Sequence, residues 1–329
     1  MAASRRVTSA DVARLAGVSR ATVSYVLNDT PRQTISAGTR TRVLDAAARL
    51  GYAPSAAART LRTGRSDVVL CLLPDWPIGT EVGSLLGHLS SALARQGLTF
   101  VVHPGTREDR PISDLWKAIT PAAVIAFSDF SDHEMAAMRS AGVALVVALL
   151  GRGRQREDAR ELEVPQELIG RRQAAHLLGA GHTRLGYAFP DDDRLRIFAE
   201  PRLAGVRATC AAAGVEPPAV ETVALDPAQA ALAVRRWHAR GITAICGYND
   251  EVALAVLAGA RTAPPRPAVI GVDDIPAARL AEPALTTVTT DQSVVAAHLA
   301  ATVVAAVAGG SAPQLPVADV VRVVPRASA

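Results

Sequence analysis

The chain has 329 residues, of which 49% are hydrophobic and 20% are charged, so it is long enough for two or three domains with large buried cores. Residues 1–66 contain eleven arginines and three aspartates, whereas the whole chain carries a net charge of only +4, so residues 67–329 are acidic in balance. A basic segment ahead of an acidic one favours binding to a polyanion such as nucleic acid, and a basic domain that is merely soluble is the alternative.

The sequence disfavours secretion and membrane insertion. The first residues, MAASRRVTSADVARLAG, contain no apolar stretch of the secretory type. The longest apolar run, residues 293–310, is mostly alanine and contains His298, so it predicts a packed helix rather than a membrane span. Cys71, Cys210 and Cys246 form no CxxC pair and are expected to be buried thiols. We therefore expect a cytoplasmic, nucleoid-associated protein with no membrane partner.

The stretch DVARLAGVSRATVSYVLN, residues 11–28, predicts two short helices around a tight turn. Thr8 is placed to cap the first helix, with Asp11 at the capping-box position. Gly17 makes the turn, and Ser19 is placed to cap the second helix. A helix-turn-helix of this kind lays its second helix in the major groove of DNA. An ordinary helical hairpin in a bundle is the alternative.

The two faces of this motif are predicted to differ. The inward face is assigned to Ala13, Leu15, Val23 and Val26. The second helix would then expose Arg20, Ala21, Ser24 and Tyr25. Arg20 at the start of that helix suits a bidentate bond to guanine, and Thr22 with the N-terminal amides suits phosphate.

A third helix is predicted between a cap at Ser36 and a stop at Gly51. The stretch APSAAARTLRTGRS that follows favours a helix but is too short to be stable alone. We therefore expect an all-α headpiece at residues 1–52 and a hinge helix or linker at residues 53–66.

From residue 67 onward, apolar β-branched runs such as DVVLCLLP and AAVIAF alternate with amphipathic segments that end in glycine. The pattern resumes after the charged stretch GRGRQREDARELEVP, and the two successive halves predict two doubly wound lobes with parallel sheets. Ligands of such sheets bind beyond the carboxyl ends of the strands, which here means a cleft between the lobes. Lobe one is assigned to about residues 67–162 plus 291–316, and lobe two to about residues 163–290 plus 317–329.

Two groups of motifs carry a family resemblance. VTSADVARLAGVSRATVSYVLN with ISAGTRTRVLDAAARLGYAPSAAARTLRTGRS resembles the DNA-binding headpiece and hinge of the lac repressor/galactose repressor family of bacterial transcriptional regulators. RLAG at 202–205, GHTRLGY at 181–187, YND at 248–250, GVDDIP at 271–276 and PALTTVTTD at 283–291 resemble the regulatory core of that family. The resemblance covers almost the whole chain. It implies a helix-turn-helix headpiece joined to a two-lobed α/β core of the periplasmic-binding-protein type.

The resemblance implies contacts with DNA. Arg20, Ala21 and Tyr25 fall where family members vary their base preference, and Tyr25 replaces a frequent arginine. Leu61 falls on the hinge leucine that wedges into the minor groove. The DNA-binding set expected from residues and resemblance together is Thr8, Ser19, Arg20, Ala21, Thr22, Ser24, Tyr25, Asn28, Ala58 and Leu61.

The resemblance also implies that Arg202, Asn249 and Asp273 line an effector cleft. Asn249 and Asp273 each follow an apolar strand, and an Arg–Asp–Asn set suits adjacent hydroxyls. An aspartate that caps a turn, Asp273 or Asp274, is the alternative. Trp76, in the loop PDWPIGTEVG, is expected either to stack on a sugar ring or to pack against its own lobe.

The chain departs from the family pattern at two places. VPQE, with Pro165 and Gln166, stands where members usually carry Asp-Asn, and LLGRG stands where many carry an acid. These losses weaken the expectation of a sugar effector. They leave open a cleft that binds no small molecule and a regulator that responds to a protein partner.

No enzyme, cofactor or metal site is expected. GRGRQRE lacks the third glycine of a dinucleotide-binding loop, and the seven histidines form no HExxH or Cys/His cluster. Asp191, Asp192 and Asp193 are interpreted as a solvated loop rather than a cation site.

The sequence therefore predicts a transcriptional regulator, specifically a repressor. It would bind a pseudo-palindromic double-stranded operator as a homodimer or a higher oligomer, with one headpiece on each half-site. A small-molecule effector, such as a sugar or a similar polar metabolite, would control its affinity. The remaining alternative is a solute-binding transport protein. Such a protein would carry a signal sequence and would lack a headpiece, and this sequence shows the reverse.

Overall fold

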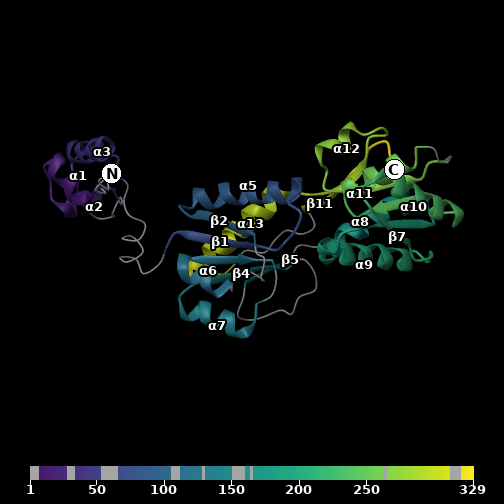
Figure 1. Ribbon diagram of the computed structural model, residues 1–329, viewed down its shortest axis with the longest axis horizontal. Coiled ribbons are helices and arrows are strands. Elements are labelled where there is room, and N and C mark those ends of the chain that lie inside the picture. The colour runs from purple at the N-terminus through teal and green to yellow at the C-terminus, as the bar shows by residue number, and fades with distance from the viewer. Residues whose placement is uncertain are drawn as a thin grey trace, which may run out of the picture. The chain divides into compact units, whose positions relative to one another are not determined.

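The computed structural model describes residues 7–27, 34–52, 66–104, 112–127, 130–149, 160–163, 166–261, 265–311 and 320–329. The chain forms two compact units, residues 1–66 and residues 67–329 (Figure 1).

The first unit contains α1 (Ser9–Ala16), α2 (Arg20–Leu27) and α3 (Ala37–Leu50). Local side-chain bonds begin and end these helices. Thr8 and Asp11 form the predicted capping box, and the Ser36 hydroxyl accepts a hydrogen bond from the Thr39 amide at 3.3 Å. Gly17 adopts a left-handed conformation, with φ of 67°, which lets the chain turn sharply into α2. The three predicted helices are therefore confirmed.

Small and β-branched residues fill the core of this unit. The buried set is Val12, Ala13, Ala16, Val23, Val26, Val43, Ala46 and Ala47. The expectation that Leu15 faces inward is wrong, because its side chain is 45% exposed while Val12 is fully buried. Successive helical residues are about 100° apart, so an inward stripe formed by Val12, Ala13 and Ala16 leaves Leu15 on its flank.

Lobe one of the second unit contains a parallel sheet with the strand order β2-β1-β3-β4-β5. The strands are β1 (Val68–Leu73), β2 (Thr99–Pro104), β3 (Ala123–Ala126), β4 (Ala144–Leu149) and β5 (Arg160–Glu163). The helices are α5 (Thr80–Arg95), α6 (Ile112–Ile119), α7 (Asp132–Ser140) and α13 (Gln292–Ala308). The sequence did not predict α6 or β5.

The two faces of this sheet are covered by different helices (Figure 1). Val69 and Cys71 of β1 pack with α5 and α13, whereas Leu70 and Leu72 pack with α6 and α7. This alternation follows from the two-residue period of a strand. It explains why β1 is an uninterrupted apolar run, since both of its faces are buried.

Lobe two contains a sheet with the strand order β11-β10-β9-β8-β6-β7. The strands are β6 (Leu185–Pro190), β7 (Ala219–Val223), β8 (Ala244–Gly247), β9 (Ala268–Val272), β10 (Thr286–Thr290) and β11 (Val321–Val324). All neighbouring pairs are parallel except β10 with β11, which is antiparallel. The sheet is therefore parallel, as predicted, with one antiparallel strand added at its edge.

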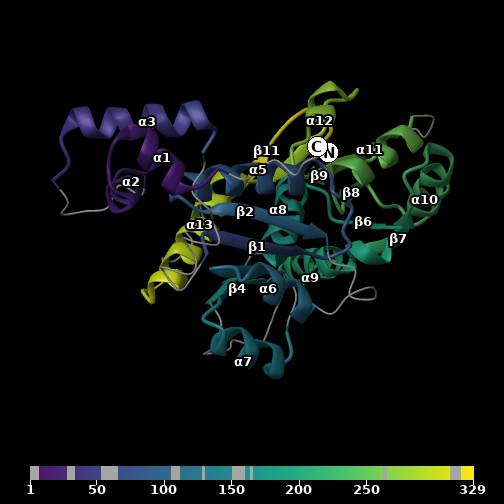
Figure 2. The ribbon, with the colours of Figure 1, turned by 60° about the vertical axis from the view of Figure 1, so that its left-hand side comes forward.

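The helices of lobe two are α8 (Gln166–Gly179), α9 (Arg196–Ala212), α10 (Pro227–Ala239), α11 (Asp250–Gly259) and the short α12 (Pro276–Leu280). Helices α8 and α9 pack on one face and α10 and α11 on the other (Figures 1 and 2). Helix α9 begins five residues before Pro201 and runs through that proline.

The apolar run at residues 293–310 forms most of α13, which buries Val295, Leu299 and Val303 in the core of lobe one. The expectation of a packed helix is thus confirmed. Within the described part of the chain, no helix combines the length and apolar character needed to cross a membrane.

Candidate nucleic-acid interface and ligand cleft

The exposed surface of α2 carries the residues predicted to read bases. Arg20, Ala21 and Tyr25 are exposed and Ser24 is half-buried, while Val23 and Val26 fix the opposite side of the helix in the core. The helix therefore presents a guanidinium group, a methyl group, a hydroxyl and a phenol on one surface. These groups match the donors, acceptors and apolar contacts that base edges accept.

The small polar residues at the helix starts make local bonds. The Ser19 hydroxyl accepts a bond from the Thr22 amide at 3.1 Å and pairs with the Thr22 hydroxyl at 2.9 Å. The Thr8 hydroxyl donates to Asp11 at 2.7 Å. These bonds orient the starts of α1 and α2, where free backbone N–H groups suit phosphate. The predicted contacts Asn28, Ala58 and Leu61 lie outside the described residues.

The second unit has two adjoining hollows between its lobes. The first, here called the polar hollow, has a volume of about 120 Å³ and is lined by Trp76, Glu81, Arg202, Asn249, Glu251 and Asp273, among others. The second, here called the apolar hollow, has a volume of about 90 Å³ and is lined mainly by Leu73, Leu85, Phe127, Ile169, Val295 and Leu299. The two hollows have six lining residues in common, so together they form one cleft; these are Trp76, Glu81, Val82, Phe198, Arg202 and Asp273.

Arg202 is the most firmly held charged group of the cleft. Helix α9 buries it to 6% exposure, and its Nε donates to Gln166 at 2.8 Å. Its Nη1 donates to the Tyr248 carbonyl oxygen at 2.8 Å, and its guanidinium lies 4.9 Å from the centroid of the Tyr248 ring. These contacts connect α8, α9 and the end of β8. Arg202 therefore stabilises the packing of lobe two and also lines the cleft.

Asp273 follows β9 and is held in an unusual backbone conformation, with φ of 114°. Its N–H donates to the Val288 carbonyl oxygen at 2.8 Å, and its carboxylate lies 4.0 Å from Arg202. Burial raises the pKa of Asp273 to about 7; Arg202 opposes this shift, and the carboxylates of Glu81 and Glu251 add to it. The side chain thus faces the cleft beside two other acids.

Asp274, the neighbouring carboxylate, is bound elsewhere. It accepts a hydrogen bond from Arg326, and its other oxygen pairs with Arg279 at 3.2 Å. Of the two aspartates that follow β9, only Asp273 lines the cleft, whereas Asp274 anchors the C-terminal segment.

Asn249 lines the polar hollow but is also the cap of α11, since its Oδ1 accepts a bond from the Val252 amide at 3.0 Å. Asp250, next to it, is fully buried and accepts bonds from the Thr287 hydroxyl at 2.6 Å and from the Ile275 amide at 2.9 Å. Burial raises the pKa of Asp250 to about 7, against the effect of the Thr287 bond. Asp250 therefore holds the segment after β9 from behind.

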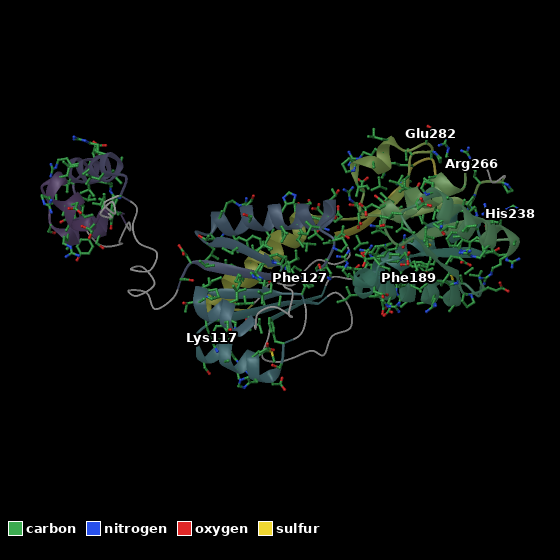
Figure 3. The ribbon with its side chains drawn as sticks, viewed as in Figure 1. Lys117, Phe127, Phe189, His238, Arg266 and Glu282 are labelled. Atoms are coloured by element: carbon green, nitrogen blue, oxygen red, sulfur yellow. The ribbon has the colours of Figure 1, made fainter. Side chains whose placement is uncertain are left out.

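Trp76 bridges the two lobes. Its ring lies 5.2 Å from that of Phe127 in lobe one and 4.8 Å from that of Phe198 in lobe two. Figure 3 shows Phe127 at the end of lobe one that faces lobe two. Trp76 packs against its own lobe and also lines both hollows, so the two alternatives for this residue are compatible.

Sequence reasoning did not include several lining residues. Glu81, the second residue of α5, accepts a bond from Gln292 at 2.7 Å, although the two are 211 residues apart. Gln166 is buried as the partner of Arg202. Phe198 and Glu251 also line the cleft. Among these, Gln166 stands at a departure from the family pattern and Glu251 lies two residues after a cleft asparagine, whereas Glu81 and Phe198 had no signal in the sequence.

The aspartates at residues 191–193 differ in their surroundings. Asp192 bonds the Arg194 backbone and side chain, and the Arg194 partner lowers the pKa of Asp192. Asp193 is 95% exposed. Across the described residues, no group of three or more His, Cys, Asp or Glu side chains is placed to hold a metal ion.

Comparison with known proteins places both units. Residues 8–55 match the family described as bacterial regulatory proteins of the lacI family, and residues 174–329 match a periplasmic binding protein-like domain. The transcriptional regulator CelR of Thermobifida fusca is 31% identical and covers 86% of this chain and 87% of its own length. The regulator GalS of Salmonella typhimurium is 29% identical over 86% of this chain and 84% of its own.

Two solved structures extend the likeness over the whole length. A CelR–cellobiose complex has a TM-score of 0.65 at 25% identity, and covers 98% of this chain and 100% of its own. The lac repressor dimer bound to operator and the anti-inducer ONPF has a TM-score of 0.78 at 22% identity, with 98% and 99% covered. The second likeness concerns the fold alone.

Proposed function

Because the chain belongs to the lacI family of bacterial regulatory proteins, it is an effector-controlled, DNA-binding transcriptional regulator, and we propose that it is a repressor. In this proposal, residues 1–52 bind DNA, residues 53–66 connect the units, and residues 67–329 bind the effector and dimerise. The exposed surface of α2 carries the proposal, because its polar groups and methyl group stand on a rigid helix in an arginine-rich unit.

The operator is proposed to be a pseudo-palindrome. A homodimer presents two copies of α2, and each copy enters the major groove of one half-site. The lac repressor that resembles this chain was solved as a dimer on its operator, which supports this assembly. A dimer binds one operator, whereas a higher oligomer would bind more than one operator at the same time.

The hinge is proposed to act through Leu61. An apolar wedge in the minor groove unstacks a base step, which is cheapest at a pyrimidine–purine step. Leu61→Gly is expected to lose specific operator affinity while the salt-dependent affinity for random DNA persists. Equal operator affinity of the variant and the parent protein would contradict this role.

The cleft is proposed to bind a small effector through Trp76, Arg202, Asn249 and Asp273. CelR, which resembles this chain, was solved with cellobiose, which supports a carbohydrate or similar polar ligand as the starting hypothesis. The second candidate is a response to a protein partner, and it rests on Gln166. This residue stands at a departure from the family pattern, and its side-chain oxygen already accepts a hydrogen bond from Arg202 Nε at 2.8 Å.

The test combines operator selection with a ligand response. Selection from random DNA with the full chain is expected to yield a two-fold symmetric site. Gel shifts with that site then screen metabolites for release or recruitment. Asp273→Ala is expected to abolish the response and keep operator binding in ligand-free protein. Arg202→Ala is also expected to abolish the response and keep operator binding. Because this change removes the hydrogen-bond partner of the buried Gln166, the folding of the variant needs a separate check.

A further inference from the structure

The polar hollow has more negative than positive groups. Glu81, Glu251 and Asp273 line it from α5, α11 and the end of β9, and Arg202 is the one cation among the described residues that line it. Glu81 and Glu251 act together on Asp273, since both raise its pKa. The three carboxylates therefore lie close enough to interact across the cleft.

Arg202 does not neutralise this excess. Its Nε and Nη1 each donate a bond of 2.8 Å, to Gln166 and to the Tyr248 carbonyl oxygen. Its Nη2 lies 4.0 Å from Asp273, which is too far for a hydrogen bond. Among the described residues, no donor reaches the Asp273 carboxylate within hydrogen-bond distance, although that side chain is only 19% exposed. This largely buried carboxylate therefore has the Arg202 charge 4.0 Å away as its ion-pair partner, but no hydrogen bond from the described part of the chain.

The carboxylates restrict the kind of ligand group that satisfies them. An ionised carboxylate only accepts hydrogen bonds, whereas a sugar hydroxyl both donates and accepts. The hollow also holds side-chain donors, namely the Trp76 indole, the Tyr248 and Thr80 hydroxyls, the Asn249 amide and the remaining N–H groups of Arg202. An ammonium group has three donors and no acceptor, so it matches a site of acceptors and gains charge-assisted bonds.

The apolar hollow adds a second requirement. Leucine, isoleucine and valine side chains line most of it from both lobes. Trp76 and Phe198, whose rings lie 4.8 Å apart, line both hollows, and so do Glu81, Arg202 and Asp273. A polyhydroxylated ligand would leave this surface without an apolar partner. An aromatic or aliphatic group buries it and gains about 25 cal/mol per Å² of apolar area.

We propose that the cleft takes an amphipathic ammonium compound, an amine attached to an aromatic or aliphatic body. The ammonium group lies among Glu81, Glu251 and Asp273, and the body lies against Trp76 and Phe198 in the apolar hollow. This inference rests on the proposed function, because it names the class of the effector that the cleft binds. It replaces the carbohydrate of the starting hypothesis.

The test uses the full-length protein in isothermal titration calorimetry near neutral pH. Three probes share one shape: phenethylamine, its uncharged analogue phenethyl alcohol and its anionic analogue hydrocinnamate. Glucose and cellobiose are the carbohydrate probes. We expect phenethylamine to bind at least about tenfold more tightly than phenethyl alcohol, and hydrocinnamate to bind most weakly.

Variants locate the effect. Glu81→Gln and Asp273→Asn are expected to weaken phenethylamine binding and to leave phenethyl alcohol binding unchanged, since they remove charge and keep shape. Glu216→Gln is the matched control, because that carboxylate is 80% exposed and does not line either hollow. Addition of phenethylamine is also expected to change the affinity of the parent protein for its operator.

The other outcomes overturn the inference. Equal binding of the amine and the alcohol, or preference for hydrocinnamate, contradicts the ammonium site. Cellobiose or glucose binding in the absence of phenethylamine binding overturns the ligand class and leaves the proposed effector-controlled repressor intact. Failure of every probe, with intact operator binding, overturns the ligand class and favours the protein-partner alternative for the cleft.

Discussion

The headpiece and the cleft are built from residues at very different separations along the chain. In the headpiece, Thr8 bonds Asp11 and Ser36 bonds Thr39, each pair three residues apart. Behind the cleft, Asp250 bonds Thr287 across 37 residues, and in the cleft Gln292 bonds Glu81 across 211. A substitution in the headpiece is therefore expected to affect mainly the helix in which it lies. A change in the cleft is expected to spread through several elements.

The largest effect is expected at the contact between α8 and α9, which positions Arg202. A Cβ atom at Gly170 would lie 1.8 Å from the Arg202 backbone oxygen. Because backbone cannot yield as a side chain does, Gly170→Ala is expected to lower the free energy of unfolding by about 3 kcal/mol or more. Thermal melting of the full chain measures it. Gly179→Ala in the same helix is the control, since nothing lies within 4 Å there, and an equal loss in both variants would contradict the contact.

A second effect is expected from two buried acids, Asp273 in the cleft and Asp250 behind it. Burial raises the pKa of Asp250 and of Asp273 to about 7 in the folded protein, from an ordinary value of 3.8. The folded state then binds more protons than the unfolded state between about pH 4 and pH 7, so stability is greatest at the acid end of this window. It falls as pH rises through it.

Variants isolate this dependence on pH. We expect the melting temperature of the second unit to fall by several degrees as pH rises through the window, and Asp250→Asn with Asp273→Asn to flatten the fall. Melting curves at several pH values measure it. A parent protein whose melting temperature rises from pH 4 to pH 7, or a double variant with an unchanged slope, would show that these carboxyls are not the cause.

In the headpiece, Arg20→Ala is expected to weaken specific operator binding by about 1–3 kcal/mol and to relax the preference at one base pair of each half-site. The fold should be unaffected, since Arg20 is exposed. Operator selection with both proteins measures the preference. Arg49→Ala, at an exposed site on α3, is the control and should lower affinity without changing the preference. Identical selected sequences for Arg20→Ala and the parent would exclude base reading by Arg20.

The smallest effect is expected at Leu15. Because its side chain is 45% exposed, Leu15→Ala should change the stability of the first unit by no more than about 0.5 kcal/mol. Val12→Ala, at a fully buried site on the same helix, should cost about 2 kcal/mol. Hydrogen exchange of the α1–α3 amides measures both. An equal loss of stability in the two variants would contradict the exposed position of Leu15 and support the inward position that the sequence pattern predicted.

Local chemistry made the elements predictable. The capping residues Thr8 and Ser36 and the glycines Gly17 and Gly51 determine where the headpiece helices begin and end, because their bonds and backbone angles involve only near neighbours. The apolar runs of the core likewise predicted most strands, and the residues that follow β8 and β9 predicted Asn249 and Asp273 as cleft residues. Both do line the polar hollow.

Only the tertiary structure decided the rest, because it depends on partners far away in the chain. The strand β5 has the polar sequence RELE, and it forms by pairing with β4. The strand β11 pairs with β10 in the antiparallel direction. Gln292 brings its amide to Glu81, and Gly170 lets α9 approach so that Arg202 reaches Tyr248. A sequence pattern reports the period of a helix or strand, but it does not report which distant surface that element meets. The acidic and apolar halves of the cleft were therefore visible only once the two lobes had been assembled.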